Sequence, residues 1–490
     1  MPLTLQRSDL LRATFPVGGR WCEAASGARY DVEDPASAQA FASVPDGDAR
    51  DARAALEAAH SAFPAWRAVP ARDRSRILAR WNDLLLEHRQ DLGKLISREQ
   101  GKPLAEAVGE IAYAASYVEW FAGEAVRSHG DVIPPPVRGR QMLAVKEPVG
   151  VVAAITPWNF PAAMIARKIA PALAAGCTVV AKPAEDTPLT SLALAALAEE
   201  AGVPAGVLNL VTASRANAAG VVDVWLADAR VRKLTFTGST PVGRHLARAS
   251  ADTLKKLSLE LGGNAPFIVF EDADLDAAVD GLMAAKFRNA GQTCVCPNRV
   301  YVHEAVHEDF VARLVARVSA LRVAPATDPQ AQIGPLINAR AVDKVERHVR
   351  DALSKGARLA TGGNRLPDLG ANFYQPTVLT DVGNDMDFAC EETFGPMVPV
   401  FRFRDEAAVL AEANGTPYGL ASYFYTRNVR RIARVSAALE SGLVGINEGA
   451  VAAEAAPFGG VKASGYGREG SRHGLDEYMH FKYLCQGGLD

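Results

Sequence analysis

Two cysteines one residue apart, Cys294 and Cys296, lie in the stretch FRNAGQTCVCP (residues 287–297). A catalytic cysteine needs a partly exposed, electropositive position, and Cys294 follows Gly-Gln-Thr after a predicted helix, which fits an exposed loop. A buried cysteine is more often an inert small hydrophobe, and the stretch alone favours that interpretation. No metal site is predicted, because the pair offers at most half of a zinc ligand set and the nearest histidine is His303.

Two more polar side chains occur where predicted strands end. Glu260, in LELGGNAP (259–266), lies between leucines, where a carboxylate is costly to bury. Asn159, in TPWNFP (156–161), has an amide that could donate a hydrogen bond to an oxyanion. The alternatives are a structural carboxylate at a strand end and a cap on the next helix.

Two segments have features of a nucleotide site. FTGSTPVGR (236–244) follows a predicted strand and opens a helix, where backbone amides attract phosphate, although it lacks the G-x-G-x-x-G spacing and also fits a plain corner. In KPAEDTP (182–188), Lys182 and Glu185 could bind ribose hydroxyls. A carboxylate there repels a 2′-phosphate and so favours NAD over NADP. The alternative for Glu185 is a solvated helix start that serves the helix dipole.

These residues are distributed over a regular alternation of predicted elements. Short apolar runs at 149–156, 177–182, 207–212 and 232–238 are separated by segments of helical length, which predicts a doubly wound parallel sheet covered on both faces. Helical periodicity covers most of 46–130, and a Pro-rich extended ribbon follows at 130–150. A second α/β pattern starts near 262, and MHFKYL (479–484) has strand character that could pair outside its own domain.

Composition bounds the class of protein. The chain has 490 residues, 49% apolar and 22% charged, with a net charge of −3, so we expect a globular protein of two or three domains. No basic patch, long apolar window or apolar leader is evident, and we expect neither nucleic acid nor membrane as a partner. Six sparse cysteines fit a reducing cytoplasm better than a disulfide framework.

Seven motifs in order resemble those of the NAD(P)-dependent aldehyde dehydrogenases. They are TPWNFP, KPAE, FTGST, LELGGNAP, FRNAGQTC, EETFGP (391–396) and PFGGVKASGYGREG (457–470). The resemblance implies a Rossmann-type cofactor domain, an α/β catalytic domain and a small β element for oligomerisation. These would comprise residues 1–130 with 150–261, residues 262–456, and residues 131–149 with 470–490, in a homodimer or homotetramer.

The resemblance also assigns roles. Cys294 would attack the aldehyde to give a thiohemiacetal and then a thioester, Asn159 would hold the oxyanion, and Glu260 would activate the hydrolytic water. The cofactor, NAD rather than NADP, would be bound by Thr156, Pro157, Trp158, Lys182, Glu185, Gly238, Ser239, Gly262, Glu392 and Phe394.

Within the family, the chain looks closest to the succinate-semialdehyde dehydrogenases. Arg167, Arg288 and Ser464 match the positions that hold the distal carboxylate in that subgroup, and a guanidinium suits such a contact. Both arginines could instead be surface cations, and glutarate semialdehyde is a rival substrate, since one methylene discriminates weakly. Some relatives close a reversible disulfide between the cysteines equivalent to Cys294 and Cys296; the alternative is a bystander thiol at Cys296.

Overall fold

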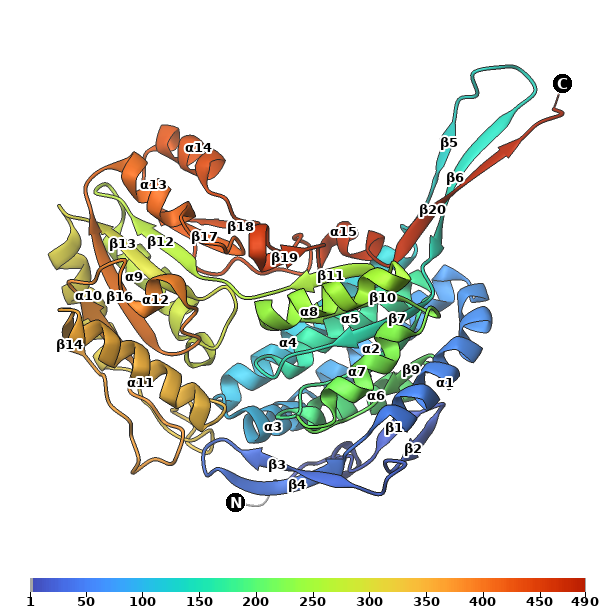
Figure 1. Ribbon diagram of the computed structural model, residues 1–490, viewed down its shortest axis with the longest axis horizontal. Helices are drawn as coiled ribbons and strands as arrows, with labels where there is room; N and C mark the ends of the chain where they lie inside the picture. Colours follow the sequence, from blue (N-terminus) through green and yellow to red (C-terminus); the bar gives the residue numbers. More distant parts are fainter. Residues whose placement is uncertain (1–2, 490) are drawn as a thin grey trace.

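The computed structural model describes residues 3–489. Two α/β bodies lie side by side, and a narrow β arm projects from one of them (Figure 1). This agrees with the fold class expected from the alternating strands and helices. The bodies are called here the cofactor body and the catalytic body, after the motifs that each contains.

The cofactor body is built on a six-stranded sheet. Four of its strands coincide with the apolar runs predicted from the sequence, and all pair in parallel except the short antiparallel edge strand β19. The order is β19 (Gly465–Tyr466), β11 (Lys256–Glu260), β10 (Val231–Thr237), β7 (Val151–Ile155), β8 (Thr178–Lys182) and β9 (Leu208–Leu210).

Helices cover both faces of this sheet because alternate side chains of each strand point to opposite faces. Val152 and Ala154 of β7 join one buried cluster, and Val151, Ala153 and Ile155 join the other. The first cluster is completed by α2 (Ala71–Glu87), α3 (Arg89–Gln100), α4 (Leu104–Ala125), α5 (Pro161–Ala175) and α6 (Pro188–Glu200). The second is completed by α1 (Ala49–Ala68), α7 (Ala218–Ala227) and α8 (Thr240–Ser250).

The N-terminal 45 residues contain two small antiparallel hairpins that the sequence pattern did not predict. Their strands are short and mix buried with exposed residues, so they lack the continuous apolar character of the central sheet. The strands are β1 (Phe15–Val17) with β2 (Arg20–Cys22), and β3 (Arg29–Asp34) with β4 (Gln39–Pro45).

The catalytic body has a seven-stranded sheet with its own buried core. Its order is β14 (Arg358–Thr361), β15 (Thr377–Thr380), β16 (Met397–Phe403), β13 (Pro297–His303), β12 (Ala265–Val269), β17 (Ala421–Tyr425) and β18 (Leu443–Ile446). The helices are α9 (Leu275–Phe287), α10 (His307–Ser319), α11 (Ala339–Ser354), α12 (Asp387–Cys390), α13 (Glu406–Asn414) and α14 (Val429–Ala438).

The arm joins the Pro-rich ribbon to the C-terminal tail (Figure 1). Strand β20 (Met479–Gln486) pairs antiparallel with β6 (Gln141–Pro148) along its whole length, and β6 pairs with β5 (Asp131–Ile133). The tail therefore pairs far from its neighbours in sequence, as its strand character suggested. The short helix α15 (Ser471–Asp476), just before β20, contacts α4 and α5 as well as the base of the arm, where Asp476 pairs with Lys146 of β6 at 2.6 Å.

Two structural features are absent from residues 3–489. Within that range, no helix has the length and apolar character needed to cross a bilayer. The same range contains no group of three or more His, Cys, Asp or Glu side chains placed to bind a metal ion.

Candidate active site

The loop that carries Cys294 begins with unusual backbone geometry. Helix α9 ends at Phe287, and Asn289, Ala290 and Gly291 then adopt left-handed conformations with φ of 52°, 55° and 76°. Glycine accepts this region freely, asparagine tolerates it, and alanine does so at a cost. Such conformations persist where the surroundings enforce them, and they concentrate at functional sites.

Hydrogen bonds from both bodies hold this loop. The backbone carbonyl of Asn159, just past the end of β7, accepts a 2.9 Å hydrogen bond from Asn289 Nδ2 and another of 2.9 Å from Lys102 Nζ. Asn159 Nδ2 in turn donates to the carbonyl of Gln292 at 3.0 Å. One amide hydrogen of Asn159 is thus bonded to Gln292, two residues before Cys294. The second amide hydrogen remains available to a ligand.

Glu260 lies at the end of β11 beside the same loop. Its side chain is buried, and neither carboxylate oxygen has a hydrogen-bond partner within residues 3–489. Burial and the nearby Glu469 raise the pKa of Glu260 well above its usual value. Three residues further on, a Cβ at Gly263 would lie 2.4 Å from the carbonyl oxygen of Cys294, so the chain after Glu260 touches the loop that carries Cys294.

The two cysteines differ in environment. Cys294 is partly exposed as a residue. Enclosure of its thiol raises the pKa of Cys294 to about 12, although the positive charge of Arg167 acts to lower it. Cys296 is buried, with Sγ 3.7 Å from the carbonyl oxygen of Lys286 on α9. Both thiols are free.

The residues expected to bind the adenosine half of the cofactor gather at the carboxyl ends of β7, β8 and β10. Thr156 N–H donates to the carbonyl of Lys182 at 3.3 Å, and Lys182 Nζ lies 3.5 Å from a carboxylate oxygen of Glu185. Ser239 is the N-cap of α8 but makes no side-chain capping bond, so its hydroxyl is free for a ligand. Gly238 precedes it, with its N–H donating to the Glu260 carbonyl at 3.0 Å.

The residues expected near the nicotinamide come from both bodies. Trp158, which follows Pro157, meets Phe394 edge to face with ring centroids 5.6 Å apart. A carboxylate oxygen of Glu392 accepts a 3.2 Å hydrogen bond from the N–H of Gly263, and burial raises the pKa of Glu392 to about 7. A Cβ at Gly262 would lie only 3.0 Å from the other oxygen of Glu392, so this glycine keeps the space before the carboxylate open.

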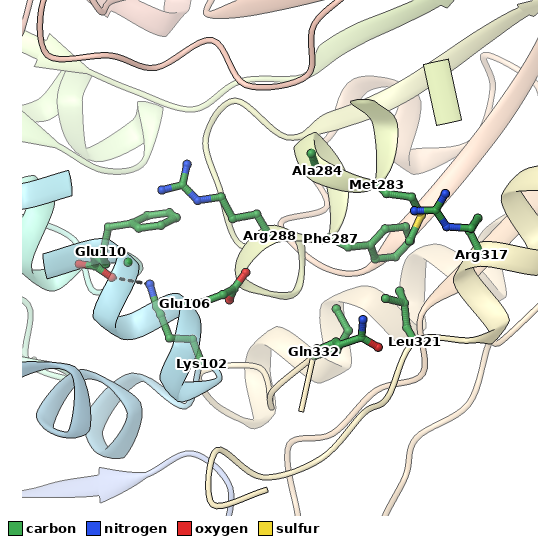
Figure 2. A pocket seen from close by; sticks show the side chains of 13 residues that line it. Lys102, Glu106, Glu110, Met283, Ala284, Phe287, Arg288, Arg317, Leu321 and Gln332 are labelled. Atoms are coloured by element: carbon green, nitrogen blue, oxygen red, sulfur yellow. Dashed lines mark hydrogen bonds and ion pairs between the residues drawn. The ribbon is translucent and has the colours of Figure 1, made fainter. Parts of the chain in front are cut away.

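Arg288 is exposed and borders a cavity of about 560 Å³ between the two bodies (Figure 2). Its guanidinium lies 4.6 Å from the ring centroid of Phe160 and 5.6 Å from that of Tyr113. In Figure 2 the guanidinium lies on the opposite side of the cavity from Arg317. No hydrogen bond or ion pair joins Arg288 to a protein acceptor within residues 3–489, although Glu106 lines the same cavity.

Arg167 has the opposite environment. It is buried on α5 and forms an ion pair with Glu469 of the Gly-rich loop, and Glu469 also pairs with Lys168. The ring centroid of Phe458 lies 4.5 Å from the guanidinium carbon. The Nη2 atom of Arg167 is buried without a hydrogen-bond partner within residues 3–489.

Ser464 differs from the expectation. Its side chain is fully buried, its hydroxyl donates to the Gly262 carbonyl at 2.7 Å, and it accepts from the Gly419 N–H at 3.0 Å. The hydroxyl uses its hydrogen as a donor and its oxygen as an acceptor to backbone groups. Ser464 therefore supports the Gly-rich loop and has no hydrogen left to donate to a substrate carboxylate. The resemblance to the succinate-semialdehyde dehydrogenases had implied a contact between Ser464 and the distal carboxylate.

Three contributors were not identified from the sequence: Lys168, Phe458 and Glu469. Glu469 lies within the Gly-rich motif, but its partner Lys168 is 301 residues away, and no local pattern announces such an ion pair. The signal available in the sequence was the pair of adjacent cations Arg167 and Lys168 in an otherwise apolar helix, which indicates that a buried anion must lie nearby.

Comparisons with known proteins agree with this arrangement. The model of the aldehyde dehydrogenase family matches residues 21–484. The chain is 54% identical to the NADP(+)-dependent succinate-semialdehyde dehydrogenase of Escherichia coli, over 99% of this chain and all of that protein. It is 53% identical to the glutarate-semialdehyde dehydrogenase of Pseudomonas aeruginosa, over 99% of this chain and 100% of that one.

Among solved structures, a succinate-semialdehyde dehydrogenase from Burkholderia pseudomallei superimposes with a TM-score of 0.97 at 55% identity, covering 99% of this chain and 100% of that one. Similarity of this extent in both sequence and backbone spans every motif from which the site was built. The chain therefore belongs to the aldehyde dehydrogenase family.

Proposed function

We propose that this enzyme oxidises a small aldehyde that carries a distal carboxylate, with succinate semialdehyde as the substrate and glutarate semialdehyde as the alternative. The observation that carries the proposal is the unpaired guanidinium of Arg288, held against two aromatic rings at the edge of the cavity and six residues before Cys294. A guanidinium at such a site binds a carboxylate through paired, charge-assisted hydrogen bonds.

The buried Nη2 of Arg167 supports a second contact to the same carboxylate. The names of the relatives also support a carboxylate-bearing substrate, since the E. coli and P. aeruginosa proteins are named for succinate and glutarate semialdehyde. Ser464 is left out of the proposed clamp because backbone groups occupy its hydroxyl.

The proposed chemistry starts at Cys294. After the thiol loses its proton to solvent, the thiolate sulfur bonds to the aldehyde carbon and the carbonyl oxygen becomes an oxyanion. The free amide hydrogen of Asn159 stabilises this oxyanion, and one such donor is typically worth about 10²–10³ in rate. A bound nicotinamide supplies the acceptor for the hydride that leaves this carbon. Glu260 then takes a proton from water as the water attacks the resulting thioester on Cys294, which releases the acid and the thiol.

The residues present fit a nicotinamide dinucleotide. Ser239 opens α8 with a free hydroxyl, and Gly262 leaves space in front of Glu392. We propose that Lys182 and Glu185 bind the adenosine ribose. Burial alone would raise the pKa of Glu185, but Lys182 and Arg215 outweigh it, so the net shift is downward and Glu185 is ionised at neutral pH.

An ionised carboxylate at the ribose repels a 2′-phosphate, and we therefore propose NAD over NADP. The E. coli relative is named for NADP(+), so the proposed preference for NAD would distinguish this chain from that relative. We propose that Glu185 determines it.

The remaining proposals concern assembly and location. We propose that the arm, with Val132 79% and Phe481 63% exposed, joins copies of the chain into a homodimer or homotetramer. Residues 1–130 with 150–261 would act as the cofactor domain and 262–456 as the catalytic domain. Six free cysteines favour a reducing compartment, the cytoplasm.

The test is a panel of kcat/KM values for succinate semialdehyde, glutarate semialdehyde, butanal and pentanal, each with NAD and with NADP. The two carboxylated aldehydes should exceed their uncharged analogues by about tenfold or more, because charge-assisted hydrogen bonds contribute roughly 1.5–3 kcal/mol. Cys294→Ser should abolish NADH formation with all four. Equal values for charged and uncharged aldehydes would refute the substrate proposal, and an active Cys294→Ser variant would refute the mechanism.

A further inference from the structure

We propose that Arg167 is a positioning residue whose buried charge helps Cys294 and Glu260 to lose their protons, independently of any contact with a substrate carboxylate. The inference rests on the catalytic roles proposed above for Cys294 and Glu260. It does not depend on which aldehyde is the substrate, and its test uses reactions in which no substrate carboxylate takes part.

The position of Arg167 is fixed from several sides. Helix α5 has no side-chain cap of its own, and Glu110 of α4 accepts hydrogen bonds from the N–H groups of Ala162 and Ala163 at 2.9 and 3.3 Å. Arg167 is 1% exposed on this helix and stacks on the ring of Phe458. A guanidinium held this way cannot move out to solvent, so its charge acts inside the site.

Arg167 and Lys168 share a single carboxylate. Both pair with Glu469, and Lys168 Nζ also donates to Thr237 Oγ1 at 2.6 Å. Two adjacent cations against one anion leave an excess of positive charge within this cluster. The Nη2 atom of Arg167 is buried and has no hydrogen-bond partner among the described residues, so no carboxylate neutralises this side of the guanidinium.

Glu260 lies next to the same cluster. A Cβ at Gly459, the residue after Phe458, would come within 2.8 Å of Glu260 Oε1, so the segment that stacks on Arg167 also packs against the proposed general base. The charged groups that face Glu260 are Glu469, Arg167, Lys168 and Arg468. Of these, Glu469 raises the pKa of Glu260 and the three cations lower it.

Cys294 is faced by fewer charges. Burial raises the pKa of its thiol, Arg167 lowers it, and Glu260 and Glu392 raise it further. Arg167 is thus the cation that favours the thiolate, and it acts on Cys294 and Glu260 in the same direction. Removal of its charge should make both protons harder to release.

The experiment measures the ionisation of Cys294 directly. Alkylation by iodoacetamide is followed from pH 6 to 10 in the full-length enzyme without aldehyde or cofactor, with peptide mass mapping of Cys294. Arg167→Gln should slow alkylation at pH 8 by about tenfold, since a loss of one unit in thiol acidity is a tenfold loss of thiolate well below the pKa. Arg167→Lys keeps the charge and should stay within about threefold of the parent.

A second readout uses turnover of butanal, an uncharged aldehyde. Arg167→Gln should move the alkaline rise of kcat towards higher pH, whereas Glu469→Gln, which removes the opposing negative charge, should move it towards lower pH. A merely structural disturbance would not move the two variants in opposite directions. Near-ultraviolet circular dichroism shows whether each variant is folded.

The outcomes separate the two proposals. If Arg167→Gln reacts with iodoacetamide like the parent and keeps the parent pH profile on butanal, the inference is overturned, even where succinate semialdehyde is lost as a substrate. If Glu469→Gln and Arg167→Gln shift the profile in the same direction, it is overturned as well. An active Cys294→Ser variant would instead refute the proposed mechanism on which it stands.

Discussion

Phe458 and Glu469 form an isolated backbone pair in which each N–H donates to the other's carbonyl at 2.8 Å. This pair closes the Gly-rich loop at its base and presents one aromatic ring and one carboxylate to the same guanidinium, that of Arg167. The loop motif therefore builds a charge cluster around Arg167, whereas Arg288, which has no protein partner within residues 3–489, borders the cavity between the two bodies.

The first prediction concerns Glu260→Gln. The amide cannot accept a proton from water, so hydrolysis of the thioester should slow by about 10²–10⁴ while one round of hydride transfer remains faster than steady-state turnover. Stopped-flow absorbance should show a burst of NADH followed by a slow phase. A variant whose steady-state rate matches that of the parent would exclude Glu260 as the base for hydrolysis.

The second prediction concerns Arg288→Gln. Loss of the guanidinium should raise KM for succinate semialdehyde by about 10–100-fold and change KM for butanal by less than about threefold, because only the first substrate uses a charge-assisted contact. Arg313→Gln provides a control, since Arg313 is a partly exposed arginine of α10 paired with Asp276 and Asp309. Equal losses for both aldehydes would assign Arg288 to structure.

The third prediction concerns the pH dependence of cofactor binding. The pKa of Glu392 is raised by burial to about 7, so the carboxylate is protonated below that pH and ionised above it. An ionised Glu392 accepts hydrogen bonds from a ribose, so NAD should bind about tenfold more weakly at pH 6 than at pH 8. Fluorescence titration measures the Kd. Glu392→Gln should flatten this dependence, and a parent Kd constant across that range would contradict the assignment.

The fourth prediction concerns Glu185→Ser. Without the carboxylate, the ratio of kcat/KM for NADP to that for NAD should rise by about tenfold or more, since repulsion of the 2′-phosphate is lost. Glu57→Ser removes an exposed carboxylate of α1 that pairs with Arg230 and should leave the ratio unchanged. A ratio that stays constant in Glu185→Ser would place the determinant elsewhere.

The fifth prediction concerns the two neighbouring cysteines. If Cys294 and Cys296 close a disulfide on oxidation, hydrogen peroxide should inactivate the parent enzyme and dithiothreitol should restore it. Cys296→Ala should then be inactivated without recovery, because the exposed sulfur oxidises further. Reversible loss in Cys296→Ala equal to that in the parent would make Cys296 a bystander.

The central sheet and its exit loops could be predicted because their signals are local. Near-continuous apolar strands such as Val151–Ile155 and Thr178–Lys182 are typical of a sheet buried on both faces, and the polar residues that follow them were correctly placed at its edge. The tail strand Met479–Gln486 was also recognisable from its own residues.

Other features could not be read locally. The hairpins of residues 15–45 expose about half of their residues, and of their strands only Arg29–Asp34 alternates between exposed and more buried side chains. The role of Ser464 is decided by two backbone groups, Gly262 and Gly419, which a motif does not name. The pairing of Glu469 with Arg167 depends on how two distant segments fold together.

The left-handed run from Asn289 to Gly291 has a consequence for stability. Each non-glycine residue in that region costs roughly 1–3 kcal/mol, and the run is maintained by contacts that reach across from the other body, such as the bond from Asn289 to Asn159. When those contacts break, the segment lowers its free energy by relaxing to an ordinary backbone conformation. Warming or mild denaturant should therefore release the sulfur-bearing turn before either sheet melts, and activity should vanish while most of the secondary structure persists.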